Sequence, residues 1–162
     1  MSPAPEVTLR PVEEQDWDFL LAVYSSTREH ELAQVPWNAE QKSGFLRMQF
    51  TAQTNHYKAE HPAAVHQVIC MNGTPAGRLY VDRSGEALHI LDITLLPEFR
   101  NAGAGTILLR RLMDEGAAAN KPVTIWVESF NPSQSLFARL GFQRTGEHGF
   151  NWLLRWSSRA AT

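Results

Sequence analysis

The spacing of hydrophobic residues changes along the chain, and these changes predict a mixture of strands and helices. Short alternating or continuously apolar runs, rich in β-branched and aromatic residues, predict strands at 7–10, 65–71, 76–81, 87–95, 123–127, 142–145 and 150–156. Longer segments with apolar residues three or four positions apart predict helices from residue 17 to before Pro36, and at 39–54, 104–119 and 132–140. This order, with hairpins between some strands and helices between others, favours an α/β (α+β) fold with a mixed sheet.

Individual residues mark several of these boundaries. Asp16 and Asn38 are of the types that cap helices, so we expect them to begin the first two helices. The polar and aromatic stretch 55–62 predicts a loop after the second helix, and Asn72-Gly73 predicts a tight hairpin turn. The run 87–95 is almost continuously apolar, so it should form a central strand that is covered on both faces.

The segment 100–105, which joins this central strand to a helix, carries the clearest chemical signal. Gly103 and Gly105 let the backbone approach a ligand without an intervening Cβ atom. The first N–H groups of the following helix have no partner within it, and they lie at the positive end of the helix dipole. Together these features predict an anion site suited to a pyrophosphate, to which Arg100 could add charge and Thr106 a hydroxyl.

Other phosphate-binding motifs fit this segment less well. A P-loop requires a lysine, and none follows Gly105. A dinucleotide fingerprint requires a third glycine where Leu108 stands, although Glu128 lies near the place of its acidic residue. Judged by the glycines alone, a plain helix start or a nucleotide-binding protein of another class stays open.

Two motifs at a characteristic separation resemble the GNAT superfamily of N-acetyltransferases. Arg100-x-x-Gly103-x-Gly105, after an apolar strand that ends at Pro97, is similar to motif A, R/Q-x-x-G-x-G/A. The segment 131–142, Asn-Pro-Ser-Gln-Ser-Leu-Phe-Ala-Arg-Leu-Gly-Phe, resembles motif B, N-x-(A/S)-…-L-Y-x-x-L-G-F. The resemblance covers about residues 7–156, and the segment 35–50 is similar to a bacterial subgroup of the family.

The resemblance implies one GNAT domain over residues 1–162, with about seven strands, four helices and a splayed central strand pair. It implies an acetyl-CoA-dependent N-acetyltransferase that moves an acetyl group to a primary amine of a small molecule or peptide by direct attack. The strands that contain Leu95 and Val127 would splay apart around the thioester, and a backbone N–H near Leu95 would stabilise the oxyanion. Residues 25–61 would shape the acceptor pocket.

The same resemblance implies which residues bind acetyl-CoA or coenzyme A. The backbone of Ile93, Thr94 and Leu95 would pair with the pantetheine arm like an added strand. Asn131 would contact the pantetheine or the acetyl end, and Phe137 would pack against the cofactor. The pyrophosphate would be held by the turn of motif A, namely Arg100, Asn101, Ala102, Gly103, Ala104, Gly105 and Thr106.

The sequence departs from the family pattern at Phe137, where members commonly carry a tyrosine that protonates the departing thiolate. Phenylalanine cannot donate a proton, so three alternatives stay open. The thiolate, with a pKa of about 8.5, leaves with little help. A hydroxyl of Ser133, Ser135 or Tyr80 substitutes through water. Or the chain is a CoA-binding sensor or a weakly catalytic GNAT-like module.

Two residues are candidate bases for the acceptor amine. Glu128 is preferred because it ends a strand close to the expected splay. The alternative interpretation of Glu128 is a solvated charge or an ion pair without a catalytic role. His89 lies on the motif A strand, and simple alternation puts its side chain on the same face as that of Ile93. Histidine as a residue type can take up a proton near neutral pH. The alternative interpretation of His89 is a histidine in a polar contact without a catalytic role. Asp92 should face away from His89 and must find a partner, so we interpret it as structural.

Composition mainly excludes other classes of function. The net charge of −2 and pI of about 6.3 argue against binding to nucleic acid or to an anionic membrane. The single cysteine, Cys70, allows no internal disulfide and should be buried in its apolar run. The six histidines do not fall at metal-ligand spacings, so we predict no metal.

Location and assembly follow from weaker signals. Residues 1–6 lack the basic and apolar regions of a signal peptide. No apolar run approaches the roughly 18 residues that a membrane span needs. We therefore expect a cytoplasmic protein without membrane contact. Trp126, Trp152 and Trp156 should pack the sheet or form a dimer contact, and with the habit of the family they suggest a homodimer.

Overall fold

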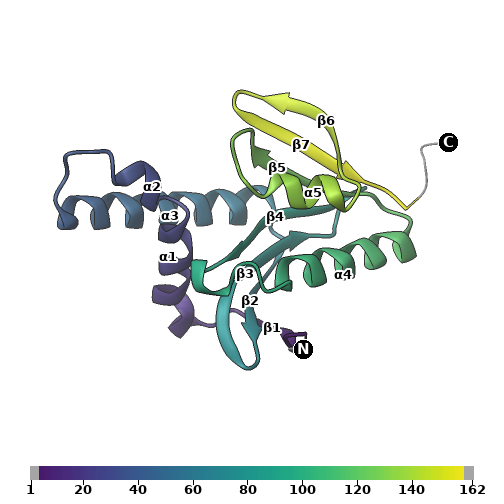
Figure 1. Ribbon diagram of the computed structural model, residues 1–162, viewed down its shortest axis with the longest axis horizontal. Helices are drawn as coiled ribbons and strands as arrows, with labels where there is room; N and C mark the ends of the chain where they lie inside the picture. Colours follow the sequence, from purple (N-terminus) through teal and green to yellow (C-terminus); the bar gives the residue numbers. More distant parts are fainter. Residues whose placement is uncertain (1–3, 159–162) are drawn as a thin grey trace.

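The computed structural model describes residues 4–158, so residues 1–3 of the N-terminal segment discussed above lie outside the description. One seven-stranded mixed sheet has the order β1-β2-β3-β4-β5-β7-β6 (Figure 1). Its strands are β1 (Val7–Pro11), β2 (Val65–Met71), β3 (Thr74–Asp82), β4 (Leu88–Leu95), β5 (Val123–Glu128), β6 (Gln143–His148) and β7 (Asn151–Trp156). The α-helices are α1 (Trp17–Ser26), α2 (Glu29–Leu32), α3 (Ala39–Glu60), α4 (Ala104–Ala119) and α5 (Gln134–Arg139), and two 3₁₀ turns are η1 (Glu14–Asp16) and η2 (Pro97–Phe99).

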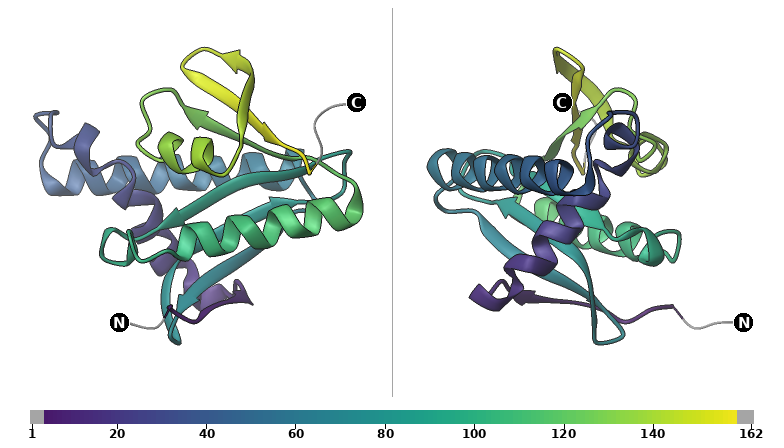
Figure 2. Two further views of the ribbon diagram at one scale, coloured as in Figure 1. Left: turned by 45° about the vertical axis from the view of Figure 1, so that its right-hand side comes forward. Right: turned by 90° about the vertical axis from the view of Figure 1, so that its left-hand side faces the viewer.

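Helices cover both faces of the sheet. Figure 2 shows α1 and α3 on one face and α4 on the other. A large hydrophobic cluster fills the α4 side; its fully buried members include Leu88, Ile90, Leu108, Leu109 and Val123. A smaller cluster of Leu20, Tyr24 and Phe50 joins α1 to α3. The expected mixed fold, with β4 central and covered on both faces, is therefore confirmed.

The central strand pair, β4 and β5, runs parallel but stays paired only at its start. Pairing extends from Leu88↔Val123 to Ile90↔Ile125, while β4 continues to Leu95 and β5 to Glu128. Beyond Ile90 the two strands diverge, and the β5-β7-β6 part of the sheet turns away from the rest (Figures 1 and 2). The splayed pair expected from the family resemblance is present.

The N-terminal helix is shorter than the sequence predicts. Instead of continuing towards Pro36, α1 ends at Ser26 and a separate short helix, α2, follows, so residues 4–158 contain five α-helices rather than the predicted four. The hydroxyl of Ser26 donates to the Val23 carbonyl at 2.7 Å, and that of Thr27 donates to the Tyr24 carbonyl at 2.6 Å. These local side-chain bonds take carbonyls of the last turn and favour the end of the helix.

Asp16 stands at the start of α1 as predicted, but its side chain makes no capping hydrogen bond to the helix. The Asp16 side chain does not cap α1; both of its oxygens accept from the Arg10 guanidinium, at 2.7 and 2.8 Å. The Arg10 hydrogen bond is the main cause that lowers the pKa of Asp16 to about 2. The 3₁₀ turn before α1 carries the chain directly into the helix, so an arginine partner takes the carboxylate instead.

The second predicted helix begins as expected and ends later. The Gln41 N–H donates to the Asn38 side chain at 2.8 Å, which confirms the predicted cap. The expected loop at 55–62 is wrong, because α3 continues to Glu60. Tyr57 holds this extra length against the sheet: its ring packs edge-on against Tyr80 with centroids 5.3 Å apart, and its hydroxyl donates to the Leu91 carbonyl at 3.1 Å.

An irregularity in β4 changes which side chains share a face. The β3–β4 register shifts between the pairs Tyr80↔Asp92 and Val81↔Ile90, so Leu91 is an extra residue in a β-bulge. Simple alternation is broken there. The predicted phase is therefore wrong, because Ile93 packs with the α4-side cluster and shares its face with Ile90 rather than with His89.

Other local predictions are confirmed. The α4 helix spans the predicted residues, and Asn72-Gly73 turns with positive φ values of 51° and 83°. Cys70 is buried. Trp152 and Trp156 pack against the α4-side cluster, whereas Trp126 is 43% exposed.

Candidate active site

The turn before α4 is shaped to bring backbone N–H groups to the surface. Asn101 and Gly103 adopt left-handed backbone, with φ values of 63° and 88°. Gly103 is the N-cap of α4, and within the described residues no side chain caps this helix start. The N–H groups of residues 104–106 belong to the first helical turn and have no partner within the helix. They therefore offer the geometry that an anion site needs.

The two glycines of this turn differ in whether the backbone conformation requires a residue without a Cβ. At Gly103 the positive φ strains any residue with a Cβ, although that Cβ would meet nothing within 4 Å. At Gly105 φ is ordinary, and a Cβ would lie 3.5 Å from Leu136 Cδ2, which is normal contact. Packing and backbone conformation therefore do not require glycine at 105.

The last residues of β4 present an open backbone edge to the splay. The Leu96 N–H donates to the Ala76 carbonyl of β3 at 2.8 Å. Because backbone direction alternates along a strand, the groups of Leu95 and Ile93 face the opposite side, where β5 no longer pairs. Arg100 Nε donates to the Leu95 carbonyl at 2.9 Å and so ties the end of β4 to the turn.

Thr94 differs from its two neighbours. It pairs with Arg78 of β3, so its backbone faces away from the splay, and its hydroxyl donates to Asp92 Oδ1 at 2.6 Å. The predicted backbone contact between Thr94 and the pantetheine arm does not agree with this direction. An extended ligand along the open edge would meet the backbone of Ile93 and Leu95.

Glu128 lies at the open end of β5. Its carboxylate is 3.6 Å from Arg28 Nη1, and its side chain is 36% exposed. Arg28, just before α2, also bonds to Glu31 at 3.2 Å, so one guanidinium serves two carboxylates. Glu128 thus has the ion pair expected as its alternative interpretation, yet it also lines a cavity of about 430 Å³.

His89 lies where β4 and β5 still pair, before the splay. Its Nδ1 is 2.7 Å from Thr124 Oγ1, and its ring stacks on His61 with centroids 5.9 Å apart. His61 Nδ1 is in turn 2.7 Å from Asp82 Oδ2. Burial, followed by the nearby His61, lowers the pKa of His89 and favours the neutral ring. His89 therefore has the polar contact that was its alternative interpretation.

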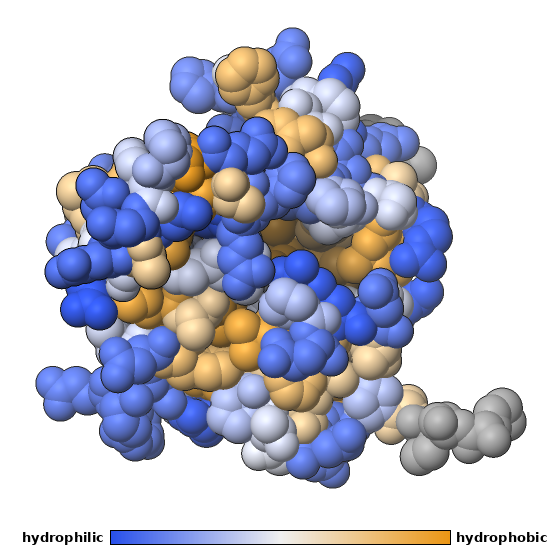
Figure 3. Space-filling view, turned by 60° about the vertical axis from the view of Figure 1, so that its left-hand side comes forward, coloured by the Kyte–Doolittle hydropathy of each residue, from blue (hydrophilic) through white to orange (hydrophobic). Residues whose placement is uncertain are grey.

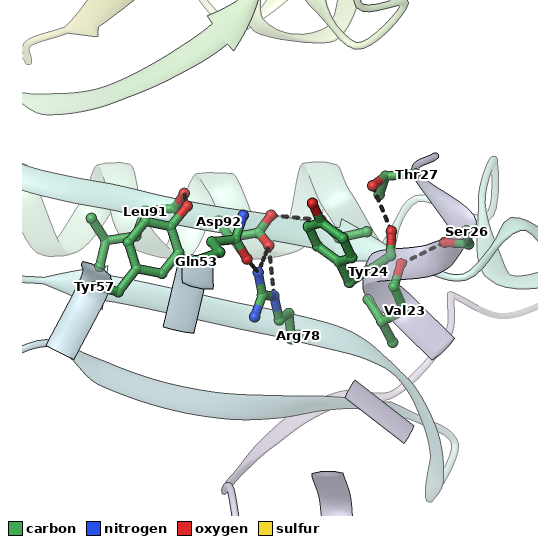
Figure 4. Close-up of polar contacts among 10 residues, drawn as sticks. Val23, Tyr24, Ser26, Thr27, Gln53, Tyr57, Arg78, Leu91 and Asp92 are labelled. Carbon is green, nitrogen blue, oxygen red and sulfur yellow. Dashed lines mark hydrogen bonds and ion pairs between the residues drawn. The ribbon is translucent and has the colours of Figure 1, made fainter. Parts of the chain in front are cut away.

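A buried arginine organises the face of the sheet beneath α3 (Figure 4). Arg78 of β3 is fully buried; its Nε donates to Asp92 Oδ2 at 2.6 Å and its Nη2 donates to the Gln53 side chain. The guanidinium carbon lies 5.3 Å from the centre of the Phe50 ring. The structural interpretation of Asp92 is confirmed, since it has found a cationic partner. Arg78 was not predicted to have this role, although a charge inside the apolar strand 76–81 was a visible signal.

Simple alternation predicted that Asp92 faces away from His89, and this prediction is wrong. The bulge at Leu91 puts both side chains on the face that α3 covers. Tyr57 also lies here, with its hydroxyl directed at Leu91 (Figure 4). Burial, and then the charge of Asp92, raise the pKa of Tyr57 to about 12, so its hydroxyl stays protonated near neutral pH.

The motif B segment is held mostly by its own hydrogen bonds. Asn131 Oδ1 accepts from the Ser133 N–H at 2.9 Å, and Gln134 Nε2 donates to the carbonyls of Glu128 and Ser129. Phe137 is only 3% exposed and packs edge-on against Phe142 at 5.3 Å. The ring therefore leaves little surface for the cofactor contact that the resemblance implied.

The sequence analysis also missed two exposed rings beside Glu128. Phe130 and Phe150 are 67% and 78% exposed and line the same cavity. Phe130 lies in a loop without a periodic pattern, and Phe150, predicted as the first residue of the strand 150–156, lies just before β7. Across residues 4–158, no three histidine, cysteine, aspartate or glutamate side chains are grouped to hold a metal ion. In that same part of the chain, no helix combines the length and apolar character required to cross a bilayer.

The model of the GNAT acetyltransferase family matches residues 22–142, which contain both motifs, the splay and α4. The chain belongs to the GNAT family of acetyltransferases. No curated protein gives a significant sequence match.

Solved structures share the GNAT fold at low sequence identity. The PaiA N-acetyltransferase from Thermoplasma acidophilum, in complex with coenzyme A, is 14% identical with a TM-score of 0.71, over 94% of this chain and 99% of that one. An acetyltransferase from Thermus thermophilus is 17% identical with a TM-score of 0.64, over 93% and 96%. Arabidopsis thaliana Naa50, bound to a bisubstrate analogue CoA-Ac-MVNAL, is 16% identical with a TM-score of 0.58, over 93% and 98%.

Proposed function

We propose that this GNAT protein binds acetyl-CoA and transfers the acetyl group to a primary amine of a small molecule or peptide. The observation that carries the proposal is one continuous feature: the open edge of β4 leads past Leu95 directly into the glycine turn that begins α4. An extended arm with a pyrophosphate at its end fits such an edge and turn. The complexes of PaiA with coenzyme A and of Naa50 with a CoA analogue support this cofactor.

The cofactor would be held mainly by backbone groups. Residues 101–106 would bind the pyrophosphate through N–H groups, with Arg100 adding positive charge at the same turn. Ile93 and Leu95 would pair with the pantetheine arm, and Asn131 lies across the splay at the start of motif B. Phe137 would contribute at most the edge of its ring.

Acetyl-CoA supplies a thioester whose carbonyl carbon is open to attack by an uncharged amine. Glu128 would take the proton from the acceptor's ammonium group, because its carboxylate lies at the open end of the splay. The Leu95 N–H, which faces the gap, would hydrogen-bond the developing oxyanion. A C–N bond forms as the C–S bond breaks, and water rather than Phe137 would protonate the departing thiolate.

His89 is the less favoured base in this proposal. It lies before the splay, it is buried, and its Nδ1 is already engaged with Thr124. A proton would have to reach it through intervening groups. We therefore expect Glu128→Gln to lower kcat by about 100-fold and His89→Gln to have a much smaller effect. Release of free thiol from acetyl-CoA, followed with an amine acceptor, measures both. Equal losses, or a larger loss for His89→Gln, would reverse the assignment.

A CoA-binding sensor is the second candidate, and the apolar, buried Phe137 is the observation that favours it. Thermal unfolding with and without acetyl-CoA tests both, since a ligand at about 100 times its Kd adds about 2.7 kcal/mol of stability. A thermal shift with amine-dependent thiol release supports the enzyme. A shift without release across a broad set of amines supports the sensor. No shift at millimolar acetyl-CoA would exclude both.

A further inference from the structure

The cavity beside Glu128 is built from three separate parts of the chain. Arg28 comes from the α1–α2 junction, Glu128 and Phe130 from the end of β5, and the turn between β6 and β7 provides His148, Gly149, Phe150 and Asn151. Its volume of about 430 Å³ suits a small molecule. Figure 3 shows that this side of the molecule is hollowed and that hydrophobic residues lie inside the hollow.

Two phenylalanine rings stand at this cavity without a role in the core. Phe130 and Phe150 are 67% and 78% exposed, more than any other large hydrophobic residue of residues 4–158. They are brought together by the backbone, because the Ser129 N–H donates to the Phe150 carbonyl at 2.7 Å. Exposed rings at the rim of a cavity gain stability when an apolar ligand group removes them from water.

The charges around the cavity favour a cation next to these rings. Arg28 is shared by Glu31 and Glu128, so the three charged groups leave one net negative charge when His148 is neutral. The Glu128 contact with Arg28 is long, at 3.6 Å, and leaves this carboxylate able to accept further hydrogen bonds. A carboxylate-bearing ligand would meet Glu128 and an arginine that is already paired with two carboxylates.

We propose that the acceptor is a small primary amine that carries an apolar, preferably aromatic, group and no carboxylate. This inference rests on the proposed acetyl transfer and adds the chemical class of its acceptor. The ammonium group lies against Glu128, at the end of the splay, and the apolar group lies between Phe130 and Phe150. A second ammonium group, as in a linear diamine, would lie between the rings with no carboxylate partner.

Thiol-release kinetics with a matched set of amines tests the class. We expect 2-phenylethylamine to have a kcat/KM about 10-fold or more above that of ethylamine, 1,4-diaminobutane and phenylalanine. The variant Phe150→Ala should lower kcat/KM for 2-phenylethylamine about 10-fold and leave the value for ethylamine unchanged. Val65→Ala is the control, because Val65 is 46% exposed at the start of β2 and lies outside both the cavity and residues 25–61. It should change neither value.

Several results would overturn the inference. One such result is a kcat/KM for ethylamine or the diamine equal to that for 2-phenylethylamine. Another is an equal loss of kcat/KM for all amines in Phe150→Ala. A third is a higher kcat/KM for a peptide with an N-terminal phenylalanine. A calorimetric titration with 2-phenylethylamine and 2-phenylethanol supplies a readout without catalysis. 2-Phenylethylamine should bind to the wild type. 2-Phenylethanol should bind to the wild type at least about 10-fold more weakly, and 2-phenylethylamine should bind to Phe150→Ala at least about 10-fold more weakly. Equal binding in either comparison would overturn the inference.

The two proposals fail in different ways. If acetyl-CoA produces no thermal shift, the acetyl transfer fails, and the titration with 2-phenylethylamine still decides the cavity. If acetyl-CoA binds and polar amines are acetylated without preference for the aromatic one, the transfer stands and only the acceptor class is wrong.

Discussion

The two faces of the sheet are stabilised by different kinds of interaction. On the α4 face, one continuous apolar cluster packs the helix against β4 and β5, and the site beside it consists of backbone groups. On the face covered by α1 and α3, the apolar cluster is small, and the buried Arg78 and the half-buried Asp92 lie between helix and sheet. A backbone site can be kept while side chains vary, whereas a polar face is specific to its particular residues.

This difference separates what binds the cofactor from what selects the acceptor. The glycine turn needs little more than a left-handed residue and a free helix start, which many sequences can supply. The acceptor side depends on where individual rings and charges stand, such as Phe150 and Glu128. The three following predictions test whether the two faces really behave in these different ways.

The largest effect should come from breaking the buried ion pair. Arg78→Met leaves Asp92 without its cation, so we expect a loss of about 3–5 kcal/mol in the free energy of unfolding. The double variant with Asp92→Leu should recover most of this loss, because an apolar pair can replace a buried ion pair. Urea denaturation measures both.

On the α4 face, Leu108→Ala provides the contrast. It should cost about 2–5 kcal/mol through a cavity, with no change of charge. A loss below about 1 kcal/mol for Arg78→Met would place this pair among weakly contributing salt bridges. It would remove the distinction between the two faces.

An intermediate effect should come from the glycine turn. Gly103→Ala places a Cβ on a residue with φ 88° at the proposed pyrophosphate site, so most of the stabilisation by acetyl-CoA, about 2.7 kcal/mol at 100 times its Kd, should disappear. Gly73→Ala is a matched control, because its φ is 83° and its Cβ would also meet nothing within 4 Å. Thermal unfolding should show similar strain in both variants without ligand. If both variants keep the full acetyl-CoA shift, the turn does not hold the cofactor.

The smallest effect is a pH dependence from the polar face. Burial is the main cause that lowers the pKa of His66 from 6.5 to about 4 in the folded chain, with a further contribution from Arg78. Between these values the unfolded chain binds more protons, so His66 should reduce stability as pH falls from 6.5 towards 4. His66→Phe keeps a ring to stack on Tyr80, where the His66 ring now lies at 4.2 Å. Urea denaturation should show a smaller difference in the free energy of unfolding between pH 7 and pH 5 for this variant than for the wild type. An unchanged difference would mean that another group causes the pH dependence.

The sequence predicted the α4 side better than the α3 side for physical reasons. The helix 104–119 and the strand 65–71 have the predicted bounds, because regular periodicity and turn residues such as Gly103 and Asn72 define them. The left-handed turn at Gly103 was identified for the same reason, and the binding of a cofactor by its residues stays a prediction. By contrast, Tyr57 extends α3 through contacts with distant strands, which no local pattern records.

The candidate acceptor site was only partly predictable. Glu128 was identified from its position at a strand end, but Arg28 became its partner through the chain's path after α1. Phe130 and Phe150 are far apart in sequence and come together where the β5–β7 pairing ends, beside the hydrogen bond from the Ser129 N–H to the Phe150 carbonyl. The position of Asp92 was wrong because a bulge adds one residue without altering the hydrophobic character of the strand.

The extra residue at Leu91 has a consequence for how this strand tolerates a change in length. It offsets the two halves of β4 by one position, so that Ile90 before it and Ile93 after it both lie against the α4-side cluster. Deleting Leu91 alone would join the halves into one regular alternation with the same core residues, although Tyr57 would lose the carbonyl that it contacts. Inserting one more residue there would also leave Ile93 on the α4 face in a regular alternation, but it would move every later residue of β4 two positions along β3, so that Ile93 would leave Leu79 and lie opposite Gly77. The strand can therefore lose a residue at this point far more easily than it can gain one.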